Sequence, residues 1–281
     1  MKKRSVPIKR RKRMIFICIL SIVVCIIVYL KIPYSPVKKE YWNSIEKFVQ
    51  EYKMPKNKIA EDDLKVLPEA LQKYFINNGY VGIESASAVI FDFKDVDFAM
   101  GINKPKVKID YIAYDFVKEP TRTALIDSKM YGIPFQGIDI CKNGKGSMKG
   151  VVAKHITLFN TSFDIIDSAY LSECLMHPSL ALQPNITYKQ IDDYSVEATI
   201  RKNGAETTGV FYFNKAYEMT SFVVEKRLCA ETNTYEKWSA IAADYEVING
   251  INVPTKLQAV WNYTSGDLIY FNGKDMKISY K

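Results

Sequence analysis

An apolar run from Met14 to Leu30 constrains this chain more than any other stretch of its sequence. Apart from two cysteines, Ser21 is its only residue that is not plainly apolar. As an α-helix, the run would rise about 26 Å at roughly 1.5 Å per residue, slightly less than the roughly 30 Å hydrocarbon core of a bilayer. Ile32 and a snorkelling Lys31 can supply the difference. The sequence therefore predicts a transmembrane helix over residues 14–31.

A dense basic segment precedes this run and sets its direction. Residues 1–13 contain eight lysines and arginines and no acidic residue. Such segments stay on the cytoplasmic side, where anionic lipid of the inner leaflet is their expected contact. The segment from Tyr29 to Pro36 has no A-x-A cleavage pattern, so an uncleaved signal-anchor is favoured over a signal peptide. We expect a single-pass protein of the cell membrane, with the N-terminus cytoplasmic and the C-terminal domain extracytoplasmic.

The formal net charge of +8 belongs to this same segment. It holds eight of the 39 lysines and arginines and none of the 31 acidic residues, so the rest of the chain has 31 of each sign. No basic face with interleaved aromatic residues follows residue 31, and we expect no nucleic acid as a partner.

Two further segments lead into the outer domain. Pro33 and Pro36 interrupt the helix and predict a short spacer. Apolar residues at helical spacing over Lys39–Lys53 then predict an amphipathic helix, which could lie at the membrane interface or pack on its own domain. The expected divisions are a cytoplasmic segment (1–13), the transmembrane helix (14–31), a juxtamembrane spacer and helix (32–60) and an extracytoplasmic β-rich domain (61–281).

The outer domain begins with helical signals and then changes period. Pro68 and Gly79 bracket a predicted helix over residues 67–79. Apolar residues alternate with polar ones over residues 106–113 and 195–201, which is typical of half-buried antiparallel strands. Between the strand-like runs, Asn-Gly, the preferred two-residue hairpin turn, occurs at 143–144, 203–204, 249–250 and 272–273. These signals predict a meander of hairpins.

One helical insertion interrupts the strands. The segment from Asp167 to Pro178 reads as a helix capped by Asp167 or Ser168 and ended by Pro178. It is a candidate cover for the apolar face of the sheet. The expected fold class is α+β: an N-terminal transmembrane helix, followed by a curved antiparallel β-sheet, a half-barrel, covered by helices.

Catalytic candidates are few, because the chain has only two histidines. Glu173 and His177 are four residues apart on the predicted helix and share a face, and His155 follows a glycine-bearing stretch. A catalytic role for these three residues is weaker than a structural one, since HExxH and G-x-S-x-G are absent. No CxxC or Cys/His spacing indicates a metal, and no cofactor is expected. Cys141, Cys174 and Cys229 lie in the outer domain, where an odd number allows one disulfide at most.

Aromatic residues are frequent in the strand-like runs. Phe211, Phe213, Trp238 and Trp261 could fill a core or line an apolar cavity, with core filling as the default. They are the candidate ligand-binding residues.

Several short motifs occur in an order that resembles a known family. They are Leu67-Pro-Glu-Ala-Leu-Gln-Lys-Tyr, Gly144-Lys-Gly-Ser-Met-Lys-Gly, Glu173 with Pro178, Trp238 and Tyr245, Asn249-Gly-Ile-Asn-Val-Pro-Thr, and Trp261. Across residues 64–281 the chain resembles an uncharacterised bacterial family of membrane-anchored or cytosolic proteins, a domain of unknown function. The resemblance implies a half-barrel like that of periplasmic lipoprotein carriers, with helices plugging the concave side. It implies no activity and no catalytic residue, and Cys174 and His177 depart from its pattern.

Three functions are compatible with these observations. The first is a membrane-anchored extracytoplasmic binding module for a lipid or another apolar ligand. The second is an envelope hydrolase that uses His155, Glu173 or His177, which would need two of them within hydrogen-bond reach in a cleft. The third is a structural or sensory envelope protein with an exposed apolar patch for its partner.

Overall fold

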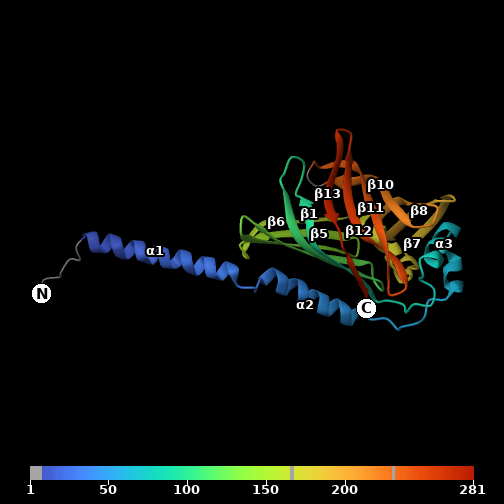
Figure 1. Cartoon of the computed structure of the whole chain (residues 1–281), viewed down its shortest axis with the longest axis horizontal. Coiled ribbons are helices and arrows are strands. Elements are labelled where there is room, and N and C mark those ends of the chain that lie inside the picture. The colour runs from blue at the N-terminus through green and yellow to red at the C-terminus, as the bar shows by residue number, and fades with distance from the viewer. Residues whose placement is uncertain (1–7, 165–167, 230–231) are drawn as a thin grey trace.

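The computed structural model describes residues 8–164, 168–229 and 232–281, and its main feature is one curved antiparallel sheet (Figure 1). The helices, of which those marked η are 3-10 helices, are α1 (Ile8–Lys31), α2 (Pro36–Glu51), η1 (Glu61–Val66), α3 (Glu69–Asn77), α4 (Ser168–Glu173), η2 (Cys174–Met176) and α5 (Pro178–Ala181). The strands are β1 (Ala88–Ala99), β2 (Lys106–Phe116), β3 (Thr121–Met130), β4 (Ile133–Lys142), β5 (Lys145–Val152), β6 (Ile156–Asp164), β7 (Ile186–Asp192), β8 (Ser195–Lys202), β9 (Ala205–Phe213), β10 (Met219–Cys229), β11 (Thr234–Ile248), β12 (Ile251–Tyr263), β13 (Gly266–Gly273) and β14 (Lys277–Tyr280). The expected α+β class, with a half-barrel that follows an N-terminal apolar helix, is confirmed.

The sheet consists of two meanders joined side by side. The strand order is β6-β5-β4-β3-β2-β1-β13-β12-β11-β10-β9-β8-β7, and β14 pairs with β1 outside this path. The junction between the meanders is the pairing of β1 with β13, where Phe98 lies opposite Phe271. Turns from the two meanders also meet, because Asn203 Nδ2 donates to the carbonyl of Asn143 at 3.1 Å.

Of the four Asn-Gly pairs that were predicted to be turns, three form hairpin turns and one does not. Both residues have positive φ at 143–144, 203–204 and 249–250, as a two-residue turn requires. Asn272-Gly273 instead ends β13, so the prediction of a turn there was wrong. Gly273 is needed for space: a Cβ atom on it would lie 2.6 Å from the ring of Phe93.

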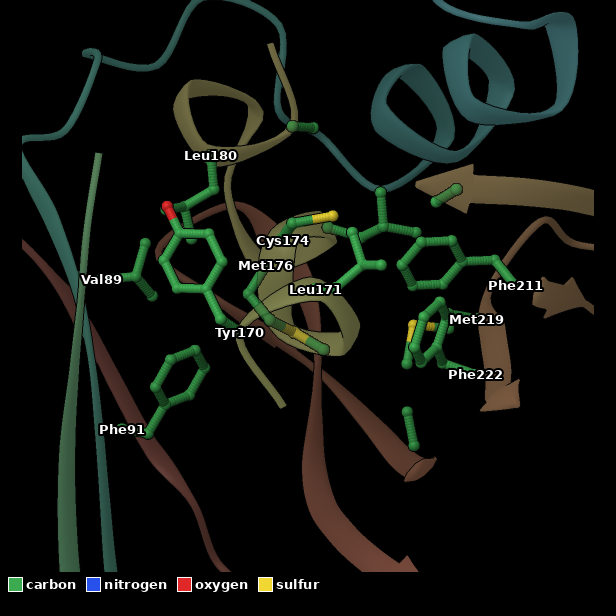
Figure 2. Close-up of a cluster of buried hydrophobic side chains, with 14 of the residues drawn as sticks. Val89, Phe91, Tyr170, Leu171, Cys174, Met176, Leu180, Phe211, Met219 and Phe222 are labelled. Carbon is green, nitrogen blue, oxygen red and sulfur yellow. The ribbon is translucent and has the colours of Figure 1, made fainter. Parts of the chain in front are cut away.

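Helices cover both faces of the sheet. The face that we call inner packs against η1, α3, α4, η2 and α5, and Figure 2 shows Leu171, Met176 and Phe222 among the side chains of this core. The opposite, outer face of β1–β5 carries α2, which buries Val37, Tyr41, Ile45 and Phe48 against it. Of the two roles considered for the amphipathic helix, packing on its own domain is the one that the structure shows.

The insertion between β6 and β7 differs from the single helix that the sequence predicts. It consists of α4, η2 and α5 in succession, and Pro178 begins α5 instead of ending a helix. His177 has an extended backbone between the two pieces, and its Nδ1 accepts a hydrogen bond from the backbone N–H of Ser179. Proline is favoured at the first position of a helix, which explains the new start at Pro178. Asp167, the other expected cap, lies outside the described residues.

Helix α1 extends away from the sheet, as Figure 1 shows. By length and composition it is a helix that could cross a membrane, and the apolar stretch that qualifies it is not buried by the rest of the chain. Ser35 caps the N-terminus of α2. The predicted interruption between the two helices, at Pro33 and Pro36, is therefore present.

Candidate ligand-binding cavity

A cavity of about 200 Å³ lies on the inner face of the sheet, beneath α4 and η2. Both meanders contribute to its wall, together with the insertion. The lining is mostly apolar, and its residues are Phe93, Phe98, Tyr111, Arg122, Ile126, Asp139, Met148, Ala169, Ser172, Glu173, Met176, Met219, Arg227, Trp238, Ala240, Leu257, Gln258, Ala259, Tyr270 and Phe271.

Small side chains leave this space open. Ala240 on β11 and Ala259 on β12 are directly opposite each other in the ladder, and both line the cavity. Ala169 on α4 lines it from the insertion. Because the neighbouring inner positions carry large side chains such as Trp238 and Phe271, the alanines leave a gap that the surrounding residues do not fill. Three methionines in the lining can change shape at low cost, since their side chains are unbranched and flexible.

A buried charged cluster forms one side of the cavity. Arg122 on β3 is 5% exposed, and its guanidinium donates to both oxygens of Glu173 on α4, from Nε at 2.8 Å and from Nη2 at 3.2 Å. Asp115 and Asp139 lie 3.7 Å and 3.8 Å from the same guanidinium. This bidentate pair ties the insertion to the sheet, because Arg122 and Glu173 belong to different elements.

Tyr111 completes this polar side. Its hydroxyl accepts a hydrogen bond from Arg122 Nη2 at 2.6 Å. Burial raises the pKa of Tyr111 well above its ordinary value, so the phenol keeps its proton at neutral pH. A neutral phenol that accepts one hydrogen bond still has its own O–H to donate. Tyr111 can therefore offer a donor to a polar group in the cavity.

A second arginine lies against the aromatic wall. The guanidinium of Arg227 is 4.4 Å from the ring centre of Trp238 and 5.4 Å from that of Trp261. Trp238 Nε1 donates to the hydroxyl of Tyr270 at 3.1 Å, and Tyr270 stacks on Trp261. These contacts fix the orientation of the indole of Trp238, which is almost fully buried.

The three catalytic candidates lie in different surroundings. Glu173 is in the cavity wall and binds Arg122. His177 is buried between Tyr80 and Tyr280, outside the cavity lining, and burial lowers its pKa to about 4. His155 is exposed beside α1, where Nε2 lies 2.6 Å from the hydroxyl of Tyr29. The structure thus gives each of them its own set of partners and does not assemble them in one cleft.

The four aromatic candidates also separate. Trp238 lines the cavity. Trp261 is not in the lining, but it contacts Arg227 and Tyr270, which are. Phe211 and Phe213 are buried in the core, where the ring of Phe211 is 4.5 Å from that of Phe222. Arg122, Tyr111 and Arg227 were not among the candidates. The one available signal was that Arg122 stands in alternation with Ala124 and Ile126, two residues that face the inner core.

The cysteines form no disulfide, and all five lie in the described part of the chain. Cys174 is buried, its sulfur is 3.5 Å from the hydroxyl of Tyr188, and burial raises its thiol pKa to about 12. A thiol in this state is a poor nucleophile, because the reactive form is the thiolate. Among the residues that the structure describes, no group of three His, Cys, Asp or Glu side chains is arranged to hold a metal ion.

The chain was compared with known families, proteins and structures. No curated protein matches it. Among solved structures, it is similar to the crystal structure of a LolA superfamily protein from Nitrosomonas europaea, with 9% sequence identity and a TM-score of 0.41, over 75% of this chain and 93% of that one. A family model described as a family of unknown function matches residues 57–273, a range that contains every strand except β14. The chain therefore belongs to DUF6544, a family of unknown function, as the motifs of its sequence led us to expect.

Proposed function

We propose that this protein is a membrane-anchored extracytoplasmic module that binds an apolar or amphiphilic ligand in the inner-face cavity. The cavity itself carries the proposal: an apolar hollow of about 200 Å³, with a charged and hydrogen-bonding cluster on one side. Ligand sites in proteins have this composition, a mostly apolar lining with a few placed polar groups.

The size of the cavity limits what it can enclose. An engineered apolar cavity of about 150 Å³ accepts benzene, while drug-sized ligands occupy roughly 300–1,000 Å³. The cavity of this protein falls between the two, so it suits the end of an acyl chain or a single ring system. Met148, Met176 and Met219 could enlarge it by changing rotamer.

The polar side favours a ligand with a hydrogen-bond acceptor. Tyr111 can donate its O–H into the cavity, and Arg122 holds that phenol in place. Trp238 is the aromatic residue that we expect to contact the apolar part.

The apolar helix and the basic residues before it support the proposed location. Helix α1 is long and apolar enough to span a membrane, and the basic residues before it favour a cytoplasmic N-terminus. The binding domain would then be held outside the membrane in which its ligand is dissolved.

Native mass spectrometry of the full chain, released from lipid nanodiscs, tests the proposal. We expect a bound small apolar molecule on the wild-type chain. Its occupancy should fall at least tenfold in the double variant A240L/A259L, which fills the cavity from two facing positions. A243L, on the same strand but outside the cavity lining, is the matched control and should retain the ligand. Equal occupancy in the wild type and the double variant would refute binding at this site.

A further inference from the structure

The turn between β5 and β6 has an unusual backbone. Ala153 and Lys154 both have positive φ, 50° and 70°, a region that residues other than glycine, asparagine and aspartate seldom adopt. Lys154 is also only 3% exposed, although lysine is among the residues least often buried. A tight hairpin turn accounts for the positive φ values, but the burial of this lysine depends on contacts of its side chain.

The contacts that bury Lys154 are with the end of α1. Lys154 Nζ donates to the carbonyl oxygens of Tyr29 at 2.5 Å and of Ile32 at 2.8 Å, and it lies 4.6 Å from the centre of the Tyr29 ring. The last carbonyls of a helix have no partner within the helix, and its C-terminus attracts positive charge. His155 adds a stacked contact and a hydrogen-bond contact with Tyr29. The turn therefore caps α1 and fixes the helix to the sheet.

A fixed helix also fixes which part of the domain lies next to it. The β3–β4 turn is at the same end of the strands as the β5–β6 turn, because the N–H of Ala153 donates to the carbonyl of Pro134 at 2.8 Å. Figure 1 shows this end of the sheet beside the junction of α1 and α2. Exposed apolar and aromatic side chains gather there, and we call them the anchor-side edge: Tyr34, Tyr131, Ile133, Ile156 and Leu158.

We propose that the anchor-side edge is a membrane-contact surface, immersed in the boundary between lipid headgroups and acyl chains. This inference rests on the proposed anchoring by α1 but not on the ligand cavity. The bilayer is the occupant that the geometry supports, because the apolar residues of the edge continue from the apolar end of α1. Tyrosine is favoured at this depth, and Tyr131 is 97% exposed at the tip of a turn. The edge would set the orientation of the half-barrel on the membrane.

Spin labels on the full chain in lipid nanodiscs measure this directly. Labels are placed through Y131C and L158C at the edge and through V247C at a control position. Val247 is likewise exposed and apolar, but it lies near the turn of β11 and β12, which contacts Asn78 after α3. Cys18 and Cys25 are replaced by alanine in these variants. A separate chain, in which Cys18 is replaced and Cys25 is kept and labelled, reports the depth of α1. The remaining three cysteines are buried.

For each label, the measured quantity is the ratio of its collision rate with oxygen to its collision rate with a water-soluble nickel chelate. We expect this ratio to be several-fold higher for Y131C and L158C labels than for V247C labels. Adding K154M should lower this ratio and increase label mobility, whereas K145M, at an exposed lysine that begins β5, should not. Edge labels as water-exposed as V247C, with a buried Cys25 label, would overturn the membrane-contact surface but leave the anchor in place. A water-exposed Cys25 label would overturn both.

Discussion

Arg122 and Glu173 join the sheet to the insertion that covers it. The two oxygens of Glu173 accept hydrogen bonds from Nε and Nη2 of Arg122 at 2.8 Å and 3.2 Å, beside the inner-face cavity. The pair connects β3 to the C-terminal end of α4 across 51 residues of sequence. It therefore holds the roof of the cavity in place as well as supplying its polar side.

Removing the arginine should destabilise the fold strongly. In R122M, the fully buried carboxylate of Asp115 and the partly buried one of Glu173 lose the cation that faces them. Breaking a buried ion pair by removing one partner costs roughly 3–5 kcal/mol. Chemical denaturation should show a loss of this size in the free energy of unfolding.

R201M is the matched control. Arg201 also forms an ion pair, with Glu206, but the two side chains are 58% and 52% exposed. Exposed pairs contribute about 0–1 kcal/mol, so R201M should have little effect. Similar losses in the two variants would contradict a special role for the buried cluster.

His177 should make stability depend on pH. Burial lowers its pKa from 6.5 to about 4, so between these values the unfolded chain binds a proton that the folded chain does not. The contribution of His177 to the free energy of unfolding is therefore complete above pH 6.5 and is lost as the pH falls to about 4. The loss amounts to about 3 kcal/mol, since one pKa unit corresponds to about 1.4 kcal/mol. Denaturation at a series of pH values checks this.

The H177N variant should flatten this part of the pH profile. Asparagine can still cap α5 as His177 does, but it does not titrate. If the free energy of unfolding of H177N depends on pH as that of the wild type does, groups other than His177 cause the pH dependence.

Gly209 should be intolerant of even the smallest side chain. A Cβ atom there would lie 2.3 Å from Cζ of Phe222, which is fully buried, so the ring would have to move. Overpacking of this kind costs typically about 1–3 kcal/mol, and G209A should lower the thermal midpoint. In G137A, on β4, the nearest atoms would be at 3.4 Å, an ordinary contact, and the midpoint should change little.

Local signals in the sequence predicted much of the fold. Alternation identified β2 and β8, and Asn-Gly pairs marked three hairpin turns. The turn predicted at Asn272-Gly273 was wrong because the glycine there allows the close approach of the Phe93 ring and does not form a turn. The break at His177 was also missed, since Pro178 can end one helix or begin the next, and only packing decides between them.

The cavity could be predicted only in part. Trp238 stood out as an aromatic residue on a strand, and Glu173 as a carboxylate on the insertion. Helical spacing placed Glu173 on one face with His177, but its partner is Arg122, on a strand earlier in the chain. Contacts between elements so far apart depend on strand order and curvature, which no local pattern encodes.

Quenching of Trp238 fluorescence by an acyl chain brominated near its end tests the central claim most directly. In a W42F/W261F chain in nanodiscs, Trp238 is the one remaining tryptophan, and it lines the cavity. We predict saturable quenching by the brominated chain, abolished when A240L/A259L fills the cavity and retained with A243L. Quenching that does not saturate, or that persists unchanged in the filled variant, would contradict ligand binding in the inner-face cavity.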